Sequence, residues 1–213
     1  MILYLFDIDG TLLHAHGSGR AAFDAVLLAQ HGLADASAGI SYGGKTDPAI
    51  LDEILVARRG RAATAAERDA FLAAYLPQLA AQLRDVEVLP GVVEALDYLA
   101  GKATLGIATG NVRAGADAKL AAARLAGRFT LGGYGCDSHV RAELVAKAIE
   151  RAGPHDEVIV VGDTIHDISA ARACGATVVA VATGADPADR LAHADAVMAT
   201  LHELPAWHAA RYG

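Results

Sequence analysis

Short apolar runs that alternate with helical patterns constrain the fold of this chain most strongly. The runs expected to be buried strands are Ile2–Phe6, Ala103–Ala108, Val158–Val161, Thr177–Val181 and, more weakly, Ala196–Met198. The helical patterns between them are Val92–Leu99, Val112–Leu125, Arg141–Ala152 and Ile168–Ala173. A chain that alternates strand and helix in this way forms a parallel sheet with helices on both faces. We therefore predict an α/β fold with a Rossmann-like parallel sheet.

One long interval interrupts this alternation. Between Leu13 and Val86 there is no convincing strand, and alanine-rich stretches indicate helices at Gly19–Gln30, Pro48–Arg58 and Ala65–Leu83. A crossover between parallel strands needs far fewer residues. We therefore expect residues 1–13 and 86–213 to form the core, and residues 14–85 to form an inserted helical domain.

Length and charge narrow the classes of partner. A chain of 213 residues suits one domain that carries a smaller insert. The formal net charge is −7 and no dense Lys/Arg run is present, so we expect no nucleic-acid or membrane partner. The apolar run at the N-terminus is too short for a membrane span. We expect a cytoplasmic protein that acts on a small molecule as a monomer or a homodimer.

Polar clusters of a matching kind follow three of the expected strands. They are Asp7-Ile8-Asp9-Gly10-Thr11, Thr109-Gly110-Asn111 and Gly162-Asp163-Thr164-Ile165-His166-Asp167. In open parallel α/β sheets, ligands bind beyond the carboxyl ends of the strands. We therefore expect all three clusters to lie at one edge of the sheet and to form an active-site cleft.

The carboxylates of this cleft predict a metal ion. Asp7, Asp9 and Asp163 would repel one another unless a positive charge lay between them. A hard divalent cation with oxygen ligands meets that need, and Mg²⁺ is the usual choice. Because Mg²⁺ held by carboxylates commonly takes further ligands from water and a substrate phosphate, a phosphorylated small molecule is the expected substrate.

The second cluster and one helix are expected to bind the phosphate. Thr109 can donate its hydroxyl and its backbone N–H, and it lies with Gly110 and Asn111 just before a helix, whose N-terminus favours anions. A cationic side chain is still needed to offset charge on the transferring group. Arg141 and Lys147, on the same expected helix, are both candidates.

These motifs together resemble those of the haloacid dehalogenase superfamily of phosphohydrolases. Its DxDGT motif is matched by Asp7 to Thr11, its second motif by Thr109, and its GDxxxD motif by Gly162 to Asp167. Its basic third motif is matched by Arg141 in HVRAELVAKAIERA, as in phosphoglycolate-phosphatase-like members, although the usual Lys-Pro pair is absent. A helical insert between the first and second motifs is the family's C1 cap, and GGKTDPAIL (residues 43–51) resembles a cap segment of that subfamily.

The resemblance implies a role for each carboxylate. Asp7 would be the nucleophile that forms an aspartyl-phosphate, which divides one difficult displacement into two easier ones. Asp9 would protonate the leaving oxygen and then activate water. Mg²⁺ would be bound by Asp7, the backbone carbonyl of Asp9 and Asp163, and Asp167 would either bind or orient these ligands from behind. Family members that cleave carbon–halogen bonds lack a carboxylate at the position of Asp9, so Asp9 favours phosphoryl transfer.

The resemblance therefore implies a Mg²⁺-dependent phosphatase for a small metabolite such as phosphoglycolate. Lys45 lies in the Gly-rich cap segment and is expected to reach the substrate when the cap closes. Because phosphonoacetaldehyde hydrolases of the family use a cap lysine as a Schiff base, that reaction competes with the phosphatase reading. A sugar-phosphate mutase and a non-catalytic metabolite-binding module compete with it as well.

Overall fold

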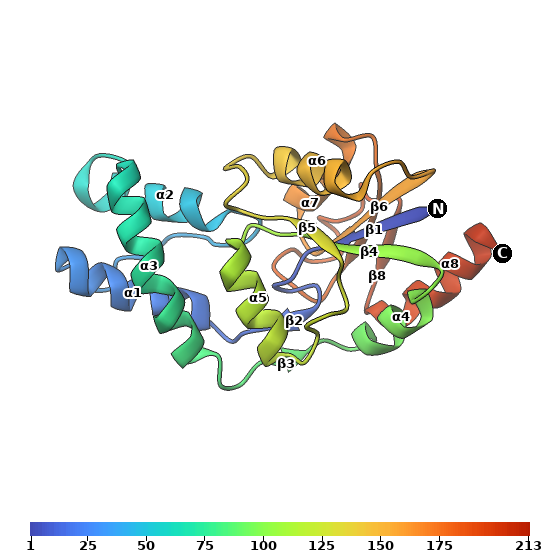
Figure 1. Ribbon diagram of the computed structural model, residues 1–213, viewed down its shortest axis with the longest axis horizontal. Helices are drawn as coiled ribbons and strands as arrows, with labels where there is room; N and C mark the ends of the chain where they lie inside the picture. Colours follow the sequence, from blue (N-terminus) through green and yellow to red (C-terminus); the bar gives the residue numbers. More distant parts are fainter.

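A six-stranded parallel sheet forms the centre of the computed structural model, which describes residues 1–213 (Figure 1). Its strand order is β5-β4-β1-β6-β7-β8, and every pairing in it is parallel. The strands are β1 (Ile2–Phe6), β4 (Ala103–Ala108), β5 (Leu131–Gly133), β6 (Glu157–Gly162), β7 (Thr177–Val181) and β8 (Ala196–Met198). The predicted α/β fold with a parallel sheet is confirmed.

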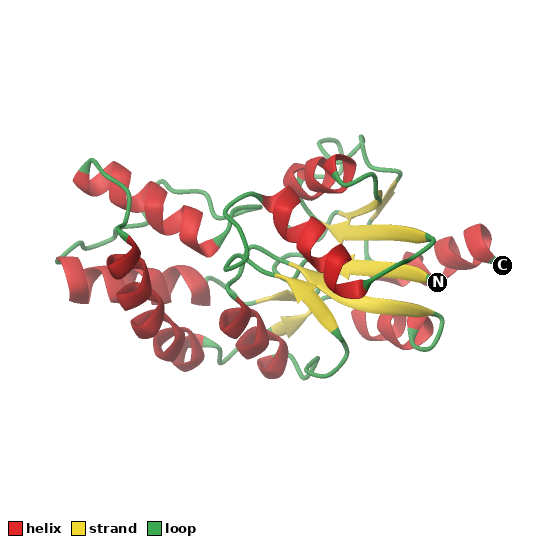
Figure 2. Cartoon of the chain, turned by 45° about the horizontal axis from the view of Figure 1, so that its top comes forward, coloured by secondary structure: helices red, strands yellow, loops and turns green.

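Helices cover both faces of this sheet, because each face is apolar. Tyr4 and Phe6 of β1 pack with α4 (Val92–Leu99), α5 (Arg113–Ala122) and α8 (Leu204–Tyr212). Leu3 and Leu5 point to the other face, where α6 (Arg141–Ala152) and α7 (Ile165–Ala173) lie. Strand side chains alternate between faces, so β1 is buried on both sides. Figure 2 shows red helices on both sides of the yellow strands. A short 3-10 helix, η1 (Leu201–Glu203), precedes α8.

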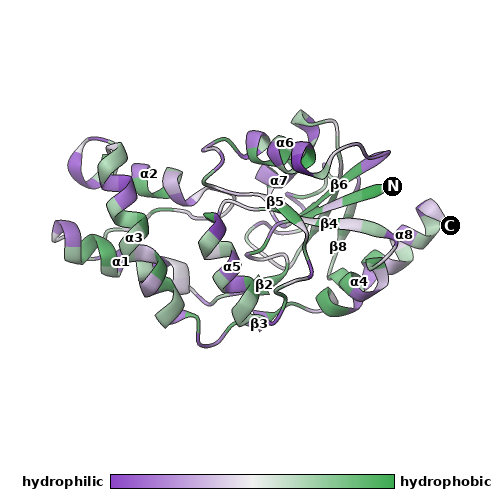
Figure 3. Cartoon of the chain, in the orientation of Figure 1, coloured by the Kyte–Doolittle hydropathy of each residue, from purple (hydrophilic) through white to green (hydrophobic).

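Helices α1 (Ser18–His31), α2 (Asp47–Arg59) and α3 (Ala65–Gln82) form a separate group, here called the helical unit. Their buried residues make a hydrophobic cluster of their own around Phe23, Phe71 and Tyr75. In Figure 3 these helices carry both hydrophilic and hydrophobic stretches, as expected for helices buried on one face. The three predicted helices therefore exist, and they pack mainly against one another beside the sheet (Figure 1).

A short ribbon joins the helical unit to the core. Strand β2 (Leu13–His14) pairs antiparallel with β3 (Glu87–Val88), so the outgoing and returning chains lie side by side. The expectation of no strand between Leu13 and Val86 was therefore wrong by this two-residue strand. Such a strand is too short to show an alternating pattern in the sequence. β5 was also missed, because its sequence, Leu-Gly-Gly, lacks the β-branched residues typical of strands.

Candidate active site

A cavity of about 550 Å³ lies between the carboxyl ends of the strands and the helical unit. From the core it is lined by Asp7, Asp9, Thr109, Gly110, Asn111, Arg141 and Asp163. From the helical unit and its connections, Lys45, Arg20, Asp47 and Tyr75 line it. The three sequence clusters that were expected at one edge of the sheet are therefore together. Asp167 lies just behind the cavity wall, in contact with Arg141.

Asp7 lies at the floor of the cavity beside a shared arginine. The Arg141 Nη2 atom is 3.0 Å from Asp7 Oδ2 and 2.5 Å from Asp167 Oδ1. All three side chains are at least nine-tenths buried. Burial raises the pKa of Asp7 to about 6, and the opposing effect of Arg141 is not enough to cancel it. Lys147 pairs instead with Glu150 at 2.8 Å on the outer surface, so the structure brings Arg141 and not Lys147 to the site.

Asp163 is held by its neighbours in the loops that follow β1 and β7. Its Oδ2 accepts a hydrogen bond from the backbone N–H of Ala185 at 2.7 Å, and its Oδ1 accepts one from the Thr11 hydroxyl at 3.2 Å. Burial, together with the nearby carboxylates of Asp167 and Asp7, raises the pKa of Asp163 to about 8. The group therefore resists ionisation unless a positive charge approaches it.

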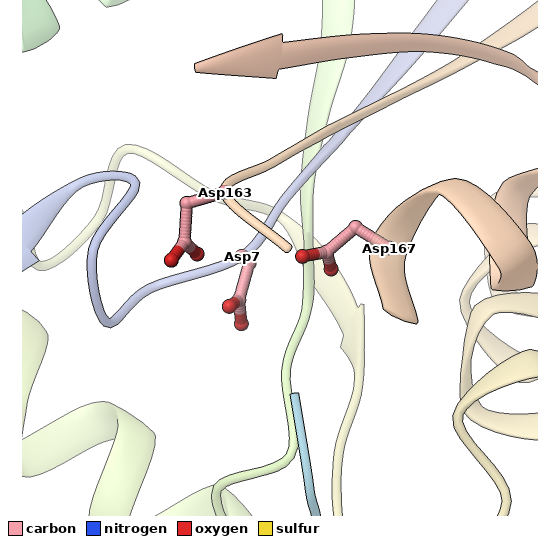
Figure 4. A group of neighbouring side chains, drawn as sticks. All are labelled: Asp7, Asp163 and Asp167. Carbon is pink, nitrogen blue, oxygen red and sulfur yellow. The ribbon is translucent and has the colours of Figure 1, made fainter. Parts of the chain in front are cut away.

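The acidic cluster fits a hard divalent cation. Carboxylates of Asp7, Asp163 and Asp167 converge from the ends of β1 and β6 and from α7, each offering an oxygen within 4.8 Å of the others (Figure 4). The Asp167 oxygens are already engaged, one by Arg141 and the other by the hydroxyl and N–H of Thr164. Asp7 and Asp163 therefore have the oxygens best placed for Mg²⁺, which prefers such donors.

Asp9 is held apart from this cluster by a lysine that sequence reasoning missed. Lys119 Nζ, from α5, lies 2.6 Å and 2.8 Å from the two carboxylate oxygens and 2.7 Å from Asn111 Oδ1. Asn111 Nδ2 also donates to Asp9 at 2.7 Å. Enclosure in the cavity would raise the pKa of Asp9, but Lys119 and Asn111 bring it below its usual value.

In the second cluster, Thr109-Gly110-Asn111, the hydrogen-bond donors that are free differ from those expected. The backbone N–H of Thr109 donates to the carbonyl of Gly133 at 3.0 Å, so the prediction that it is available to a phosphate was wrong. The sequence could not show this bond because β5 was not recognised. The Thr109 hydroxyl accepts from Asn111 Nδ2 at 2.9 Å and keeps its own proton to donate. The N–H of Gly110, by contrast, has no acceptor in the protein.

The segment before α2 crosses the core at Gly110. A Cβ atom on Gly110 would lie 2.0 Å from the carbonyl oxygen of Lys45, so only glycine fits beneath this segment. The Asp47 N–H donates to the Gly110 carbonyl at 2.8 Å, and Asp47 Oδ2 accepts from the Val112 N–H at 2.8 Å. The side chain of Lys45 pairs with Glu53 at 2.5 Å. Asp47 thus ties the start of α2 to Val112, the residue that precedes α5.

Comparison with known proteins identifies the family. The sequence matches haloacid dehalogenase-like hydrolases over residues 3–175. The chain belongs to this family. It is similar to the "Probable phosphatase IndB" of Dickeya dadantii (strain 3937), with 31% identity over 201 residues that cover 91% of this chain and 86% of that protein.

Solved structures share the fold of this haloacid dehalogenase-like hydrolase. A hydrolase from Pseudomonas syringae is 23% identical, with a TM-score of 0.75 and full coverage of both chains (100% each). A Bacteroides vulgatus protein named "Putative beta-phosphoglucomutase" is 21% identical, with a TM-score of 0.75, and the match covers 99% of this chain and 89% of that one. No helix of the hydrolase has both the length and the apolar character needed to cross a membrane.

Proposed function

We propose that this hydrolase is a Mg²⁺-dependent phosphatase that cleaves small phosphomonoesters through an aspartyl-phosphate. The observation that carries the proposal is the separation of two carboxylates in one cavity. Asp7 faces the acidic cluster and Arg141, whereas Asp9 faces Lys119 and Asn111. A nucleophile and a proton carrier need such different surroundings. The similarity to a protein named as a phosphatase supports the same reaction.

In the first half of the proposed reaction, an Asp7 oxygen attacks phosphorus and the bond to the leaving alcohol breaks. Arg141, at 3.0 Å from Asp7, offsets charge on the phosphoryl oxygens, and the Thr109 hydroxyl and Gly110 N–H donate to them. The leaving oxygen takes a proton from Asp9. A Mg²⁺ ion held by Asp7, the Asp9 carbonyl and Asp163 would supply further positive charge to the phosphoryl group.

In the second half, water attacks the aspartyl-phosphate, Asp9 takes a proton from that water, and phosphate and Asp7 are released. Lys119 and Asn111 hold the pKa of Asp9 below its usual value, which favours the form that accepts a proton. A phosphoryl group beside Asp9 adds like charge, which raises that pKa and favours the form that donates a proton. One side chain can therefore serve both halves of the reaction.

We further infer that residues 14–85 act as a C1 cap over the core of residues 1–13 and 86–213. The helical unit closes the cavity above Asp7 and keeps water from the reacting groups. Opening and closing would turn on the β2–β3 ribbon. A cavity of about 550 Å³ suits a small ester of the phosphoglycolate kind.

The competing reactions have weaker support. A Schiff-base role for Lys45 would need a free amine, but Lys45 Nζ pairs with Glu53 at 2.5 Å. The similarity to a protein named as a mutase concerns the fold alone at 21% identity. A binding module without catalysis would not need both Asp7 and Asp9 placed with separate cations.

The first experiment is phosphate release from a panel of phosphomonoesters, with Mg²⁺ and with EDTA. Because Asp7 is the proposed nucleophile, Asp7→Asn is expected to lower kcat by at least about 10³-fold. Its fold should persist, as judged by circular dichroism, because Asn has nearly the same shape. EDTA should abolish release. Full activity in the Asp7→Asn variant would refute the aspartyl-phosphate, and isomerised sugar phosphate without free phosphate would identify a mutase.

A further inference from the structure

The N-terminus of α1 opens into the roof of the cavity without a cap of its own. Its N-cap, Gly17, provides no side-chain hydrogen bond, and its first turn contains no acidic residue. The backbone N–H groups of Gly19 and Arg20 have no acceptor in the protein. All of these residues line the cavity. The first turn of a 14-residue helix therefore presents free donors and a positive dipole end to whatever the cavity holds.

A buried tyrosine on α3 adds an independent donor at the same place. Tyr75 lines the cavity although its side chain is only 1% exposed, and its hydroxyl makes no hydrogen bond within the protein. The hydroxyl lies beside the start of α1, since a Cβ atom on Gly19 would be 3.7 Å from it. Burial raises the pKa of Tyr75 well above its usual value, so the hydroxyl stays protonated and can donate. The hydroxyl oxygen is open to the cavity, so the partner of this hydroxyl is whatever the cavity holds.

Arg20 makes no direct ion pair with a carboxylate. Its guanidinium donates to the carbonyls of Ser37 and Ile40, each at 2.7 Å, and to the Ser37 hydroxyl at 3.1 Å. It stacks over the ring of Tyr42 at 4.4 Å. These contacts fix the cation in the cavity wall, and the nearest carboxylate, Asp24, reaches it only through the Ser37 hydroxyl, which donates to Asp24 at 2.8 Å. Lys45 differs, because its ammonium pairs with Glu53.

We propose that the N–H groups of Gly19 and Arg20, the Tyr75 hydroxyl and the Arg20 cation form a subsite for an anionic group on the leaving alcohol of the substrate. The subsite rests on the proposed phosphatase function, since it lies in the roof while the phosphoryl group binds at Asp7 on the floor. Its ligand is a carboxylate or a second phosphate, because both offer several oxygen acceptors to converging donors. Substrate selection thus depends on α1 and α3 rather than on Lys45.

The test compares esters that differ only in the distal group. 2-Phosphoglycolate has a carboxylate, 2-hydroxyethyl phosphate is neutral there, and phosphoethanolamine is positive. Wild-type protein is expected to show a kcat/KM for 2-phosphoglycolate at least about 30-fold above that for the neutral ester, and lowest activity with the cationic one. Ethylene glycol bisphosphate, with a second phosphate, then shows which anion the subsite prefers. Equal rates with all of these esters would overturn the proposal.

Two variants connect any preference to the named donors. Tyr75→Phe removes only the hydroxyl, and Gly19→Pro removes one N–H. Proline is acceptable there, because α2 and α8 of this chain also have it at their second residue, Pro48 and Pro205. Each variant is expected to reduce the ratio of kcat/KM between the anionic and neutral esters about tenfold. Gly19→Ala keeps the N–H and should keep the ratio. An unchanged ratio in both variants, with folding intact by circular dichroism, would overturn the assignment.

Calorimetry with the Asp7→Asn protein separates the subsite from the reaction. Tighter binding of 2-phosphoglycolate than of 2-hydroxyethyl phosphate, reduced by Tyr75→Phe, supports the subsite whether or not any ester is hydrolysed. If that preference is present and wild-type protein releases no phosphate, the subsite stands and the phosphatase function fails. If hydrolysis occurs without any binding preference, the function stands and the subsite fails.

Discussion

Asp7 and Asp9 are separated by one residue, yet their carboxylates have opposite surroundings. Asp7 is 8% exposed and shares Arg141 with Asp167, and its pKa is raised to about 6. Asp9 is 44% exposed to the cavity and has Lys119 as its own cation, and its pKa is lowered. The difference shows that the surroundings determine what each carboxylate can do: burial and neighbouring carboxylates dominate at Asp7, whereas Lys119 and Asn111 dominate at Asp9. Removing Arg141 and removing Lys119 should therefore lower kcat to different extents.

The largest loss of kcat is expected when the cation beside Asp7 is removed. Arg141→Gln removes the only cation beside Asp7 and should lower kcat by about 10²–10³-fold, because charge on the transferring group is no longer offset. Lys147→Gln is the matched control, since Lys147 is on the same helix but pairs with Glu150 at the surface. Steady-state kinetics with both variants would test this. Equal losses would show that the location of the charge does not matter.

A smaller loss of kcat is expected when the cation beside Asp9 is removed. Lys119→Met keeps the length of the side chain but frees Asp9 from its ion pair, and kcat should fall by about 10²-fold as proton transfer becomes poorly positioned. KM should change little, because Lys119 contacts Asp9 rather than the phosphoryl site. Lys119→Arg should recover part of the loss. A defect confined to KM would mean that Lys119 binds substrate instead.

Binding of Mg²⁺ to the acidic cluster can be tested through thermal stability, without measuring catalysis. The pKa values of Asp7, about 6, and Asp163, about 8, lie above the usual carboxyl value, so protons compete with a cation for these oxygens. In metal-free protein, stability contributed by these groups is full at acidic pH and is lost as pH rises through 6 and then 8. Mg²⁺ should therefore raise the Tm by several degrees near pH 8.5 and by less near pH 5.5, as measured by scanning calorimetry. A larger shift at the lower pH would contradict this cation site.

The smallest effect concerns Asp47, a further carboxylate near Lys119. Asp47→Ala removes the acceptor for the buried Val112 N–H and should cost about 1 kcal/mol, or about 2–4 °C in Tm for a chain of this size. Asp47→Asn keeps an acceptor and should be no less stable at neutral pH, because burial raises the pKa of Asp47 to about 6 and the Asn carries no charge to bury. Thermal unfolding of both variants distinguishes these outcomes.

The floor of the site could be predicted from the sequence, because parallel strands bring their carboxyl ends to one edge. Asp7, Asp163 and Thr109 each directly follow such a strand, so strand assignment was enough to place them together. Their proposed roles rest on the family motifs and are for the variants above to test. Between Arg141 and Lys147 the sequence did not decide, since both lie on the same helix and only its packing shows which one points inward.

The partners of these carboxylates could not be predicted in the same way. Lys119 lies within an alanine-rich helix with no motif around it, and its contact with Asp9 depends on how α5 packs against the sheet. Asp47 and Tyr75 belong to the helical unit, whose position over the core depends on contacts between residues far apart in the chain. A periodic pattern predicts that such helices exist, but it does not predict what their polar residues meet.

The β2–β3 ribbon has a consequence for how this protein could diversify. Leu13 pairs with Val88 and His14 with Glu87, so the chain leaves the core and returns to it on two paired strands. Any other insert whose ends lie about 5 Å apart could occupy this position without altering the order of the sheet. Replacing the helical unit at this ribbon would therefore leave the acidic floor in place while changing the side chains that line the cavity above it.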